Sequence, residues 1–227
     1  FAPNYGIRLD DHTAYTRGGD LGVLFSTGSR QGLIYDPRYV ETGVELGINL
    51  GSIFNLTASV GNPRNREFLA DPTYTARLEF TPIIANKIAL LFGGSFTSYK
   101  EQRFNAISGM NSIANIQFYG GFAGIGVGDA TLLAEYDIGK DNIVTGQKTG
   151  SLMIEGAYRI TKGLEGVVRY DRFDRNINNS NDELQRLIVG VELYPYSFIE
   201  ILPQYRLQWE TPEVKNNSFV MQIHLYY

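Results

Sequence analysis

The strongest constraint on the fold of this chain is an alternation of apolar and polar side chains with a period of two. In the segment 218–227, apolar side chains occupy every second position and mostly polar ones lie between them. The segments 198–210 and 185–195 have the same pattern. Successive side chains of a β-strand point to opposite faces, so this period predicts strands with one apolar and one polar face. We therefore expect an all-β chain.

The alternation divides the chain into about eleven strands, most of them close to the length that crosses a bilayer at a tilt. The expected strands are 40–50, 52–61, 73–83, 88–99, 114–127, 131–140, 149–160, 164–175, 185–195, 198–210 and 218–227. One more strand is expected around 21–28, within an N-terminal segment that covers 1–39. The whole chain, 1–227, is expected to be a single domain with regular strands over 40–227 and about 12 strands in all.

The expected connections alternate between short and long. Short turns are expected at 51–52, 84–87, 128–130, 161–163 and 195–197. Longer polar loops are expected at 62–72, 100–113, 141–148, 176–184 and 211–217. Short turns at one end and longer loops at the other are typical of an up-and-down, antiparallel transmembrane β-barrel.

The alternative is a soluble β-barrel or sandwich, in which the apolar face points inward. The polar faces of this chain carry ionisable side chains on many successive strands. Such a density of charge cannot line a dry core, because each buried charge needs a partner or loses its ionisation. It can line a water-filled lumen. We therefore expect apolar faces that contact lipid and polar faces that point inward.

Composition excludes several other classes. The net charge of −4 and the pI of about 5.3 give no reason to expect a nucleic-acid partner. The chain has no cysteine, which rules out disulfides and thiolate metal ligands. No metal or cofactor is expected. No apolar run approaches the ~20 residues that a membrane helix requires.

The last nine residues resemble the terminal β-signal of bacterial outer-membrane proteins, in which alternate apolar residues lead to a final aromatic residue. The matching positions are Phe219, Met221, Ile223, Leu225 and Tyr227. The strand and loop pattern over 40–227 resembles outer-membrane porins. This resemblance implies a location in the bacterial outer membrane, contact with its lipid and lipopolysaccharide, and insertion by the barrel-assembly machinery.

The segment 1–13 resembles the outer end of a porin strand that enters an extracellular loop. On that interpretation, strands precede this sequence and the full barrel has about 14 to 18 of them. Without them, the strands expected here close at about 12. The sequence leaves both the strand number and the oligomeric state open.

The polar faces of the expected strands mix arginine with acidic side chains. The candidates for lining a lumen are Arg77, Glu79, Glu135, Asp137, Glu155, Arg159, Glu165, Arg169, Arg186, Glu192 and Arg206. The hairpin that turns at Lys162 places Arg159 opposite Glu165. It also places Glu155 opposite Arg169, and each such pair contributes about 0.2–1 kcal/mol. The set forms either a wall of neutralising pairs or a charged constriction that selects solutes, and its mixed signs predict weak ion selectivity.

The expected function is an outer-membrane channel for passive diffusion of small polar solutes, which the loops 8–38 and 100–113 could narrow. The alternative is a structural or interaction barrel with a plugged lumen, acting as an anchor or assembly component. A third hypothesis, a lipid hydrolase, has only His12 and His224 as histidine bases and lacks a Gly-x-Ser-x-Gly motif. We therefore do not expect an enzyme.

Overall fold

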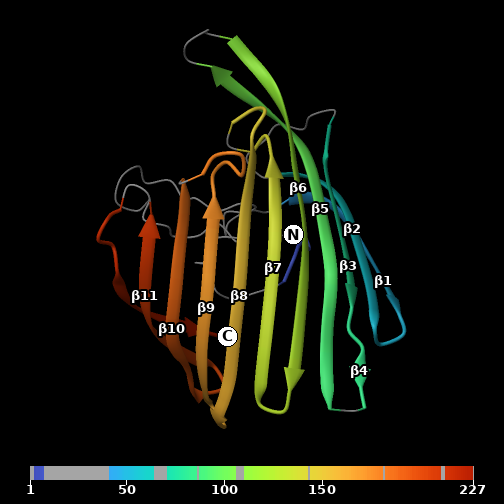
Figure 1. Ribbon diagram of the computed structural model, residues 1–227. Coiled ribbons are helices and arrows are strands. Elements are labelled where there is room, and N and C mark those ends of the chain that lie inside the picture. The colour runs from blue at the N-terminus through green and yellow to red at the C-terminus, as the bar shows by residue number, and fades with distance from the viewer. Residues whose placement is uncertain are drawn as a thin grey trace.

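A computed structural model describes residues 3–7, 41–63, 71–85, 87–105, 110–142, 144–180, 182–210 and 213–226. This part of the chain is all-β and forms one antiparallel sheet of twelve strands (Figure 1). Each long strand pairs with the strands that precede and follow it in the sequence, which is an up-and-down order. The expected all-β fold with up-and-down antiparallel strands is confirmed, whereas the strand expected around 21–28 lies outside the described residues.

The strands follow the sequence pattern closely. Their bounds are β1 Glu41–Leu50, β2 Phe54–Pro63, β3 Thr73–Phe80, β4 Ile83–Ile84, β5 Ile88–Asn105, β6 Met110–Val127, β7 Ala130–Lys140, β8 Lys148–Thr161, β9 Leu164–Asp174, β10 Glu183–Tyr196, β11 Ile199–Glu210 and β12 Ser218–Leu225. The short β4 pairs with the start of β5 beyond the end of β3. Pro82, which has no N–H to donate, lies between β3 and β4, so β4 continues β3 after an interruption.

The short turns lie together at one end of the sheet and the longer connections at the other (Figure 1). Three of the short turns contain a glycine with positive φ, Gly51, Gly128 and Gly163. Glycine adopts this conformation without the steric cost that a side chain brings, which suits tight hairpins. The expected alternation of short and long connections is therefore present in the fold, except between β5 and β6, where only residues 106–109 connect the strands.

One expected loop is wrong. Residues 100–105 and 110–113, predicted within a polar loop, belong to β5 and β6. Their register runs unbroken from Ile88 opposite Val127 to Asn105 opposite Met110. This hairpin rises beyond the other strands at the end with the long connections (Figure 1). The segments 100–105 and 110–113 are mostly polar in sequence, so the alternation that marks a half-buried strand is missing there.

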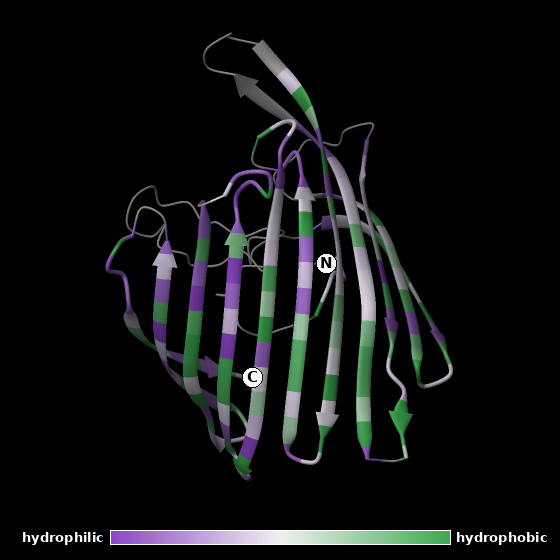
Figure 2. Ribbon diagram, in the orientation of Figure 1, coloured by the Kyte–Doolittle hydropathy of each residue, from purple (hydrophilic) through white to green (hydrophobic). Residues whose placement is uncertain are grey.

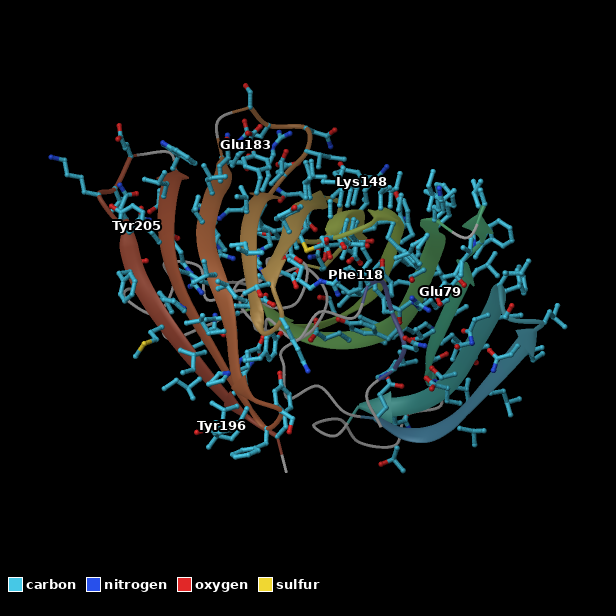
Figure 3. All side chains as sticks on the ribbon, turned by 90° about the horizontal axis from the view of Figure 1, so that it is seen from below. Glu79, Phe118, Lys148, Glu183, Tyr196 and Tyr205 are labelled. Carbon is cyan, nitrogen blue, oxygen red and sulfur yellow. The ribbon has the colours of Figure 1, made fainter. Side chains whose placement is uncertain are left out.

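The sheet curves strongly, so that it has a concave and a convex face (Figure 3). Adjacent residues of β11 illustrate how the two faces differ. Tyr205 is 49% exposed on the convex face, whereas Gln204 and Arg206 on either side are 6% and 2% exposed. Most strands also carry exposed large apolar residues. Figure 2 shows where the apolar positions lie along the ribbons. Polarity in the described residues is thus inverted relative to that of a soluble barrel with a dry apolar core.

The concave side is not uniformly polar. One buried apolar cluster contains Tyr5, Ala114, Ile116, Phe118, Phe173 and Leu184. A second contains Ile7, Phe122 and Met153. Strand β6 contributes to both clusters, because its inward positions carry apolar side chains rather than charges. Figure 3 shows Phe118 pointing into the middle of the concave side, as does Glu79, while Tyr205 points away from it.

Candidate functional site

The candidate site is the concave wall of the sheet, where the sequence places the residues expected to line a lumen. The buried members are Arg77, Glu135, Asp137, Arg169, Arg186 and Arg206. The half-buried members are Glu79, Glu155, Glu165 and Glu192. Arg159 differs from all of them, because its side chain is 61% exposed near the short-turn end.

A compact ion-pair network joins β8, β9 and β10 on this wall. The Asp171 carboxylate oxygen Oδ2 accepts hydrogen bonds from Nη2 and Nε of Arg186, at 2.8 and 3.2 Å, and from Nε of Arg169 at 3.2 Å. Arg169 also lies 3.6 Å from the Glu155 carboxylate. Arg186 and Asp171 have no exposed side-chain surface. Buried charges of this kind require mutual pairing, since neither ion retains its water.

Both cross-strand pairs predicted from the turn at Lys162 are present in the register, with Arg159 opposite Glu165 and Glu155 opposite Arg169. Their side chains behave differently. Arg169 contacts Glu155, but the Arg159 guanidinium turns away to bind Asp129 in the turn between β6 and β7. The Arg159 side chain stays hydrated at this end of the sheet, so it does not need the fixed partner that a buried ion requires.

Residues 3–7 lie against the concave wall, far in the sequence from the strands that hold them. The Gly6 N–H donates to Oγ of Ser95 at 2.8 Å, and the Gly6 carbonyl accepts from Nε of Arg77 at 2.8 Å. The Ile7 N–H donates to the Glu135 carboxylate at 3.2 Å. These bonds join the segment to β3, β5 and β7 through its backbone.

The side chains of this segment add further contacts. The Tyr5 hydroxyl donates to Oδ1 of Asp137 at 3.1 Å, and its ring belongs to the first apolar cluster. Ile7 packs in the second cluster beside Met153. At the other end of the segment, the Asn4 N–H donates to Glu45 on β1 at 3.3 Å. Tyr5 and Ile7 are nearly fully buried, so the segment is part of the packed interior.

Two glycines make room for the wall side chains that surround this segment. A Cβ on Gly120 would lie 1.9 Å from Oδ1 of Asp137. A Cβ on Gly93 would lie 2.1 Å from Cζ of Phe122, whose ring in turn lies 4.8 Å below the Arg77 guanidinium. No real Cβ is found so close to another heavy atom. These positions therefore require glycine for close approach, whatever their φ angles.

A second polar cluster joins β10, β11 and β12 near the short-turn end. The buried carboxylate of Glu200 accepts hydrogen bonds from the hydroxyls of Tyr194 at 2.7 Å and Tyr226 at 2.6 Å. Nδ1 of His224 lies 2.7 Å from the same carboxylate. His224, one of the two histidines considered as a catalytic base, is thus engaged in a contact between strands. The other, His12, lies outside the described residues.

The residues of the expected assembly signal lie on the convex face of β12. Phe219, Met221, Ile223 and Leu225 are all more than half exposed. Tyr227 lies outside the described residues, as do the segment 8–38 and most of 1–13. The polar positions between the exposed ones include Gln222 and His224, which are half-buried on the other face of the strand.

Sequence patterning missed the most connected parts of this site. Residues 3–7 are too few to carry a periodic signal, and their partners lie on strands that are distant in the sequence. Ser95 and Glu200 are ordinary polar strand residues until the fold brings donors to them. The alternation places Ser95 and Glu200 on the inward face of their strands, but it does not predict their hydrogen-bond partners.

Within the described ranges, no group of three or more histidine, aspartate or glutamate side chains is arranged to hold a metal ion. None of the described residues belongs to a helix with the length and apolarity that a membrane span requires. Comparisons with protein-family models, with curated proteins and with solved structures found no match to this chain.

Proposed function

We propose that this chain is a β-barrel protein of the bacterial outer membrane, and that it serves as a membrane-embedded structural or interaction barrel with a filled interior. The observation that carries the proposal is the inverted polarity of the sheet. Ions such as Arg186 and Asp171 are fully buried on the concave side. On the convex side, Val189 is 48% exposed and Phe219 is 68% exposed. A lipid environment is the solvent in which such an apolar exterior is stable.

The filled interior favours an anchor or assembly component over an open pore. Side chains that border a water-filled lumen keep part of their surface accessible to water. Here Asp137, Met153, Phe173 and Arg186 have essentially no accessible surface. Residues 3–7 add backbone and side-chain packing on the same face.

The partners that this proposal implies are outer-membrane lipid, lipopolysaccharide and the barrel-assembly machinery. The exposed apolar positions of β12 support the last of these, because the residues of the expected assembly signal face outward where another protein can contact them. We propose no nucleic-acid partner and no enzymatic activity.

Reconstitution tests the proposal directly. The refolded chain is expected to float with liposomes in a density gradient and to migrate differently on gels before and after boiling. In planar lipid bilayers, the folded protein is expected to produce no conductance steps. Protein that stays in the soluble fraction with a cooperative fold would contradict the membrane assignment. Regular conductance steps from the unmodified chain would contradict the filled interior.

The second candidate function is a porin-like channel for passive diffusion of small polar solutes. The observation in its favour is the mixture of Arg and acidic side chains on the concave wall, among them Arg77, Glu135 and Arg206. On this hypothesis, the interior opens to a water-filled lumen with weak ion selectivity. Discrete conductance steps, with a reversal potential close to zero in a salt gradient, are the expected result. Silent bilayers containing folded protein would reject it.

A further inference from the structure

The concave wall holds a short peptide segment by contacts that resemble ligand recognition. Residues 3–7 bond to wall residues that lie between 41 and 132 positions away in the sequence. We propose that this wall is a peptide-binding site, that Pro3–Ile7 is its resident ligand, and that the interior opens to water when this segment leaves. The inference rests on the proposed barrel for its biological meaning, but the binding site itself is a property of the folded chain.

Recognition of the peptide backbone centres on Gly6. Its N–H and C=O are both satisfied by wall side chains, Ser95 and Arg77, each at 2.8 Å. Its φ of 58° lies in the left-handed region, which glycine adopts at no steric cost. The next N–H, of Ile7, points at the Glu135 carboxylate. The wall thus supplies an acceptor for the first N–H, a donor for the following C=O and an acceptor for the next N–H.

Two side chains give the site its selectivity. The residue before the glycine is Tyr5, whose ring packs in the first apolar cluster while its hydroxyl reaches Asp137. The residue after it is Ile7, which contacts the second cluster. The ligand class that this site fits is therefore a short peptide with tyrosine, glycine and an aliphatic residue in succession, which bends at the glycine. Tyr5 combines a ring packed in an apolar cluster with a hydrogen bond to a buried carboxylate, so it is expected to contribute most to affinity.

Cysteine labelling tests whether the segment seals the interior. The chain has no cysteine, so Met153→Cys introduces a single reporter at a side chain with no accessible surface, beside Ile7. Two variants are made in this background. One replaces each of residues 3–7 by serine, and the other replaces only Tyr5 by alanine. A water-soluble maleimide is expected to label the folded protein in micelles about tenfold faster or more. The lost contacts favour exposure of the reporter to water, and each 1.4 kcal/mol changes that equilibrium tenfold. The matched control, Tyr205→Ala on the convex face, is expected to leave the rate unchanged.

Rescue by peptide tests the ligand class. A synthetic peptide with the sequence of residues 3–7 is expected to restore protection of the reporter in the serine variant. The same peptide with phenylalanine in place of tyrosine is expected to need a higher concentration. Equal labelling rates with and without the native segment, in protein whose gel mobility still shifts on boiling, would overturn the inference. So would faster labelling in the serine variant that no concentration of the native peptide slows.

Bilayer recordings separate this inference from the proposed function. Because the labelling is done in micelles, its result stands whether or not the chain enters liposomes. A serine variant that labels quickly and conducts, beside a silent unmodified chain, supports both the binding site and a barrel with a removable plug. Rapid labelling in a protein that never floats with liposomes supports the site and rejects the membrane proposal.

Discussion

The phenol oxygen of Tyr5 lies 3.1 Å from the carboxylate of Asp137, although 132 positions of sequence separate the two residues, and both are buried. This contact ties the start of the described chain to β7 across the concave side. It places a charge-assisted hydrogen bond where water is excluded, which makes its loss costly.

Tyr5→Phe is expected to lower the free energy of unfolding by about 1–3 kcal/mol, because it removes one hydrogen bond to a buried carboxylate and keeps the ring. Denaturant unfolding of the micelle-refolded protein, followed by fluorescence of the single tryptophan, Trp209, measures the change. Tyr205→Phe on the convex face is the matched control and is expected to have little effect. Equal effects of the two substitutions would contradict the buried contact.

Arg186→Met is expected to destabilise the protein by about 3–5 kcal/mol, because Asp171 would lose the partner that gives it two hydrogen bonds. The double variant Arg186→Met, Asp171→Leu is expected to recover most of the loss, since no unpaired charge remains. Arg159→Met, at the exposed pair with Asp129, is expected to cost less than about 1 kcal/mol. The same unfolding measurement compares all three.

Gly120→Ala is expected to destabilise the fold by about 1–3 kcal/mol, because the new Cβ would overlap Oδ1 of Asp137. Gly121→Ala provides an adjacent control, as its Cβ would meet its nearest neighbour, the Gly93 carbonyl oxygen, at 3.6 Å. Thermal unfolding of both variants tests the difference. A Gly121→Ala variant less stable than Gly120→Ala would argue against the orientation of β6.

Val189→Arg, on the convex face of β10, distinguishes a lipid-facing from a water-facing exterior. In lipid, an arginine near the bilayer midplane is expected to cost about 2–4 kcal/mol, falling toward zero at the interfaces. Val214→Arg, in the connection between β11 and β12, is the control and is expected to be tolerated. Folding yields in liposomes measure both. If Val189→Arg folds as well as the parent chain, the convex face does not contact hydrocarbon.

The sequence was sufficient to predict the strands and much of the pairing, because both depend on local information. A period of two sets which side chains share a face, and short turns fix the register of the hairpins that they close. This reasoning placed Glu155 opposite Arg169 correctly. It failed at the tip of the β5–β6 hairpin, where a mostly polar sequence removes the periodic signal.

The filling of the concave side could not be predicted in the same way. Which side chains pack together there depends on how strongly the sheet curves and on which distant segments lie against it. Ile116 and Phe118 alternate regularly along β6, but the pattern alone does not say that this apolar row points inward. Tyr5 carried no signal, since its partners lie on strands far along the chain.

The up-and-down order of the sheet has a consequence for how it can be completed. Because β4 continues β3, strand direction reverses regularly from β1 to β12, and both edge strands run toward the end with the short turns. If these two edges met directly, their ladder would be parallel, unlike every other pairing in the sheet. A ring that is antiparallel throughout therefore requires an odd number of extra strands between them. When β3 and β4 count as one strand, the sheet has eleven strands, and adding an odd number gives an even total. An even number is also the rule for single-chain bacterial barrels.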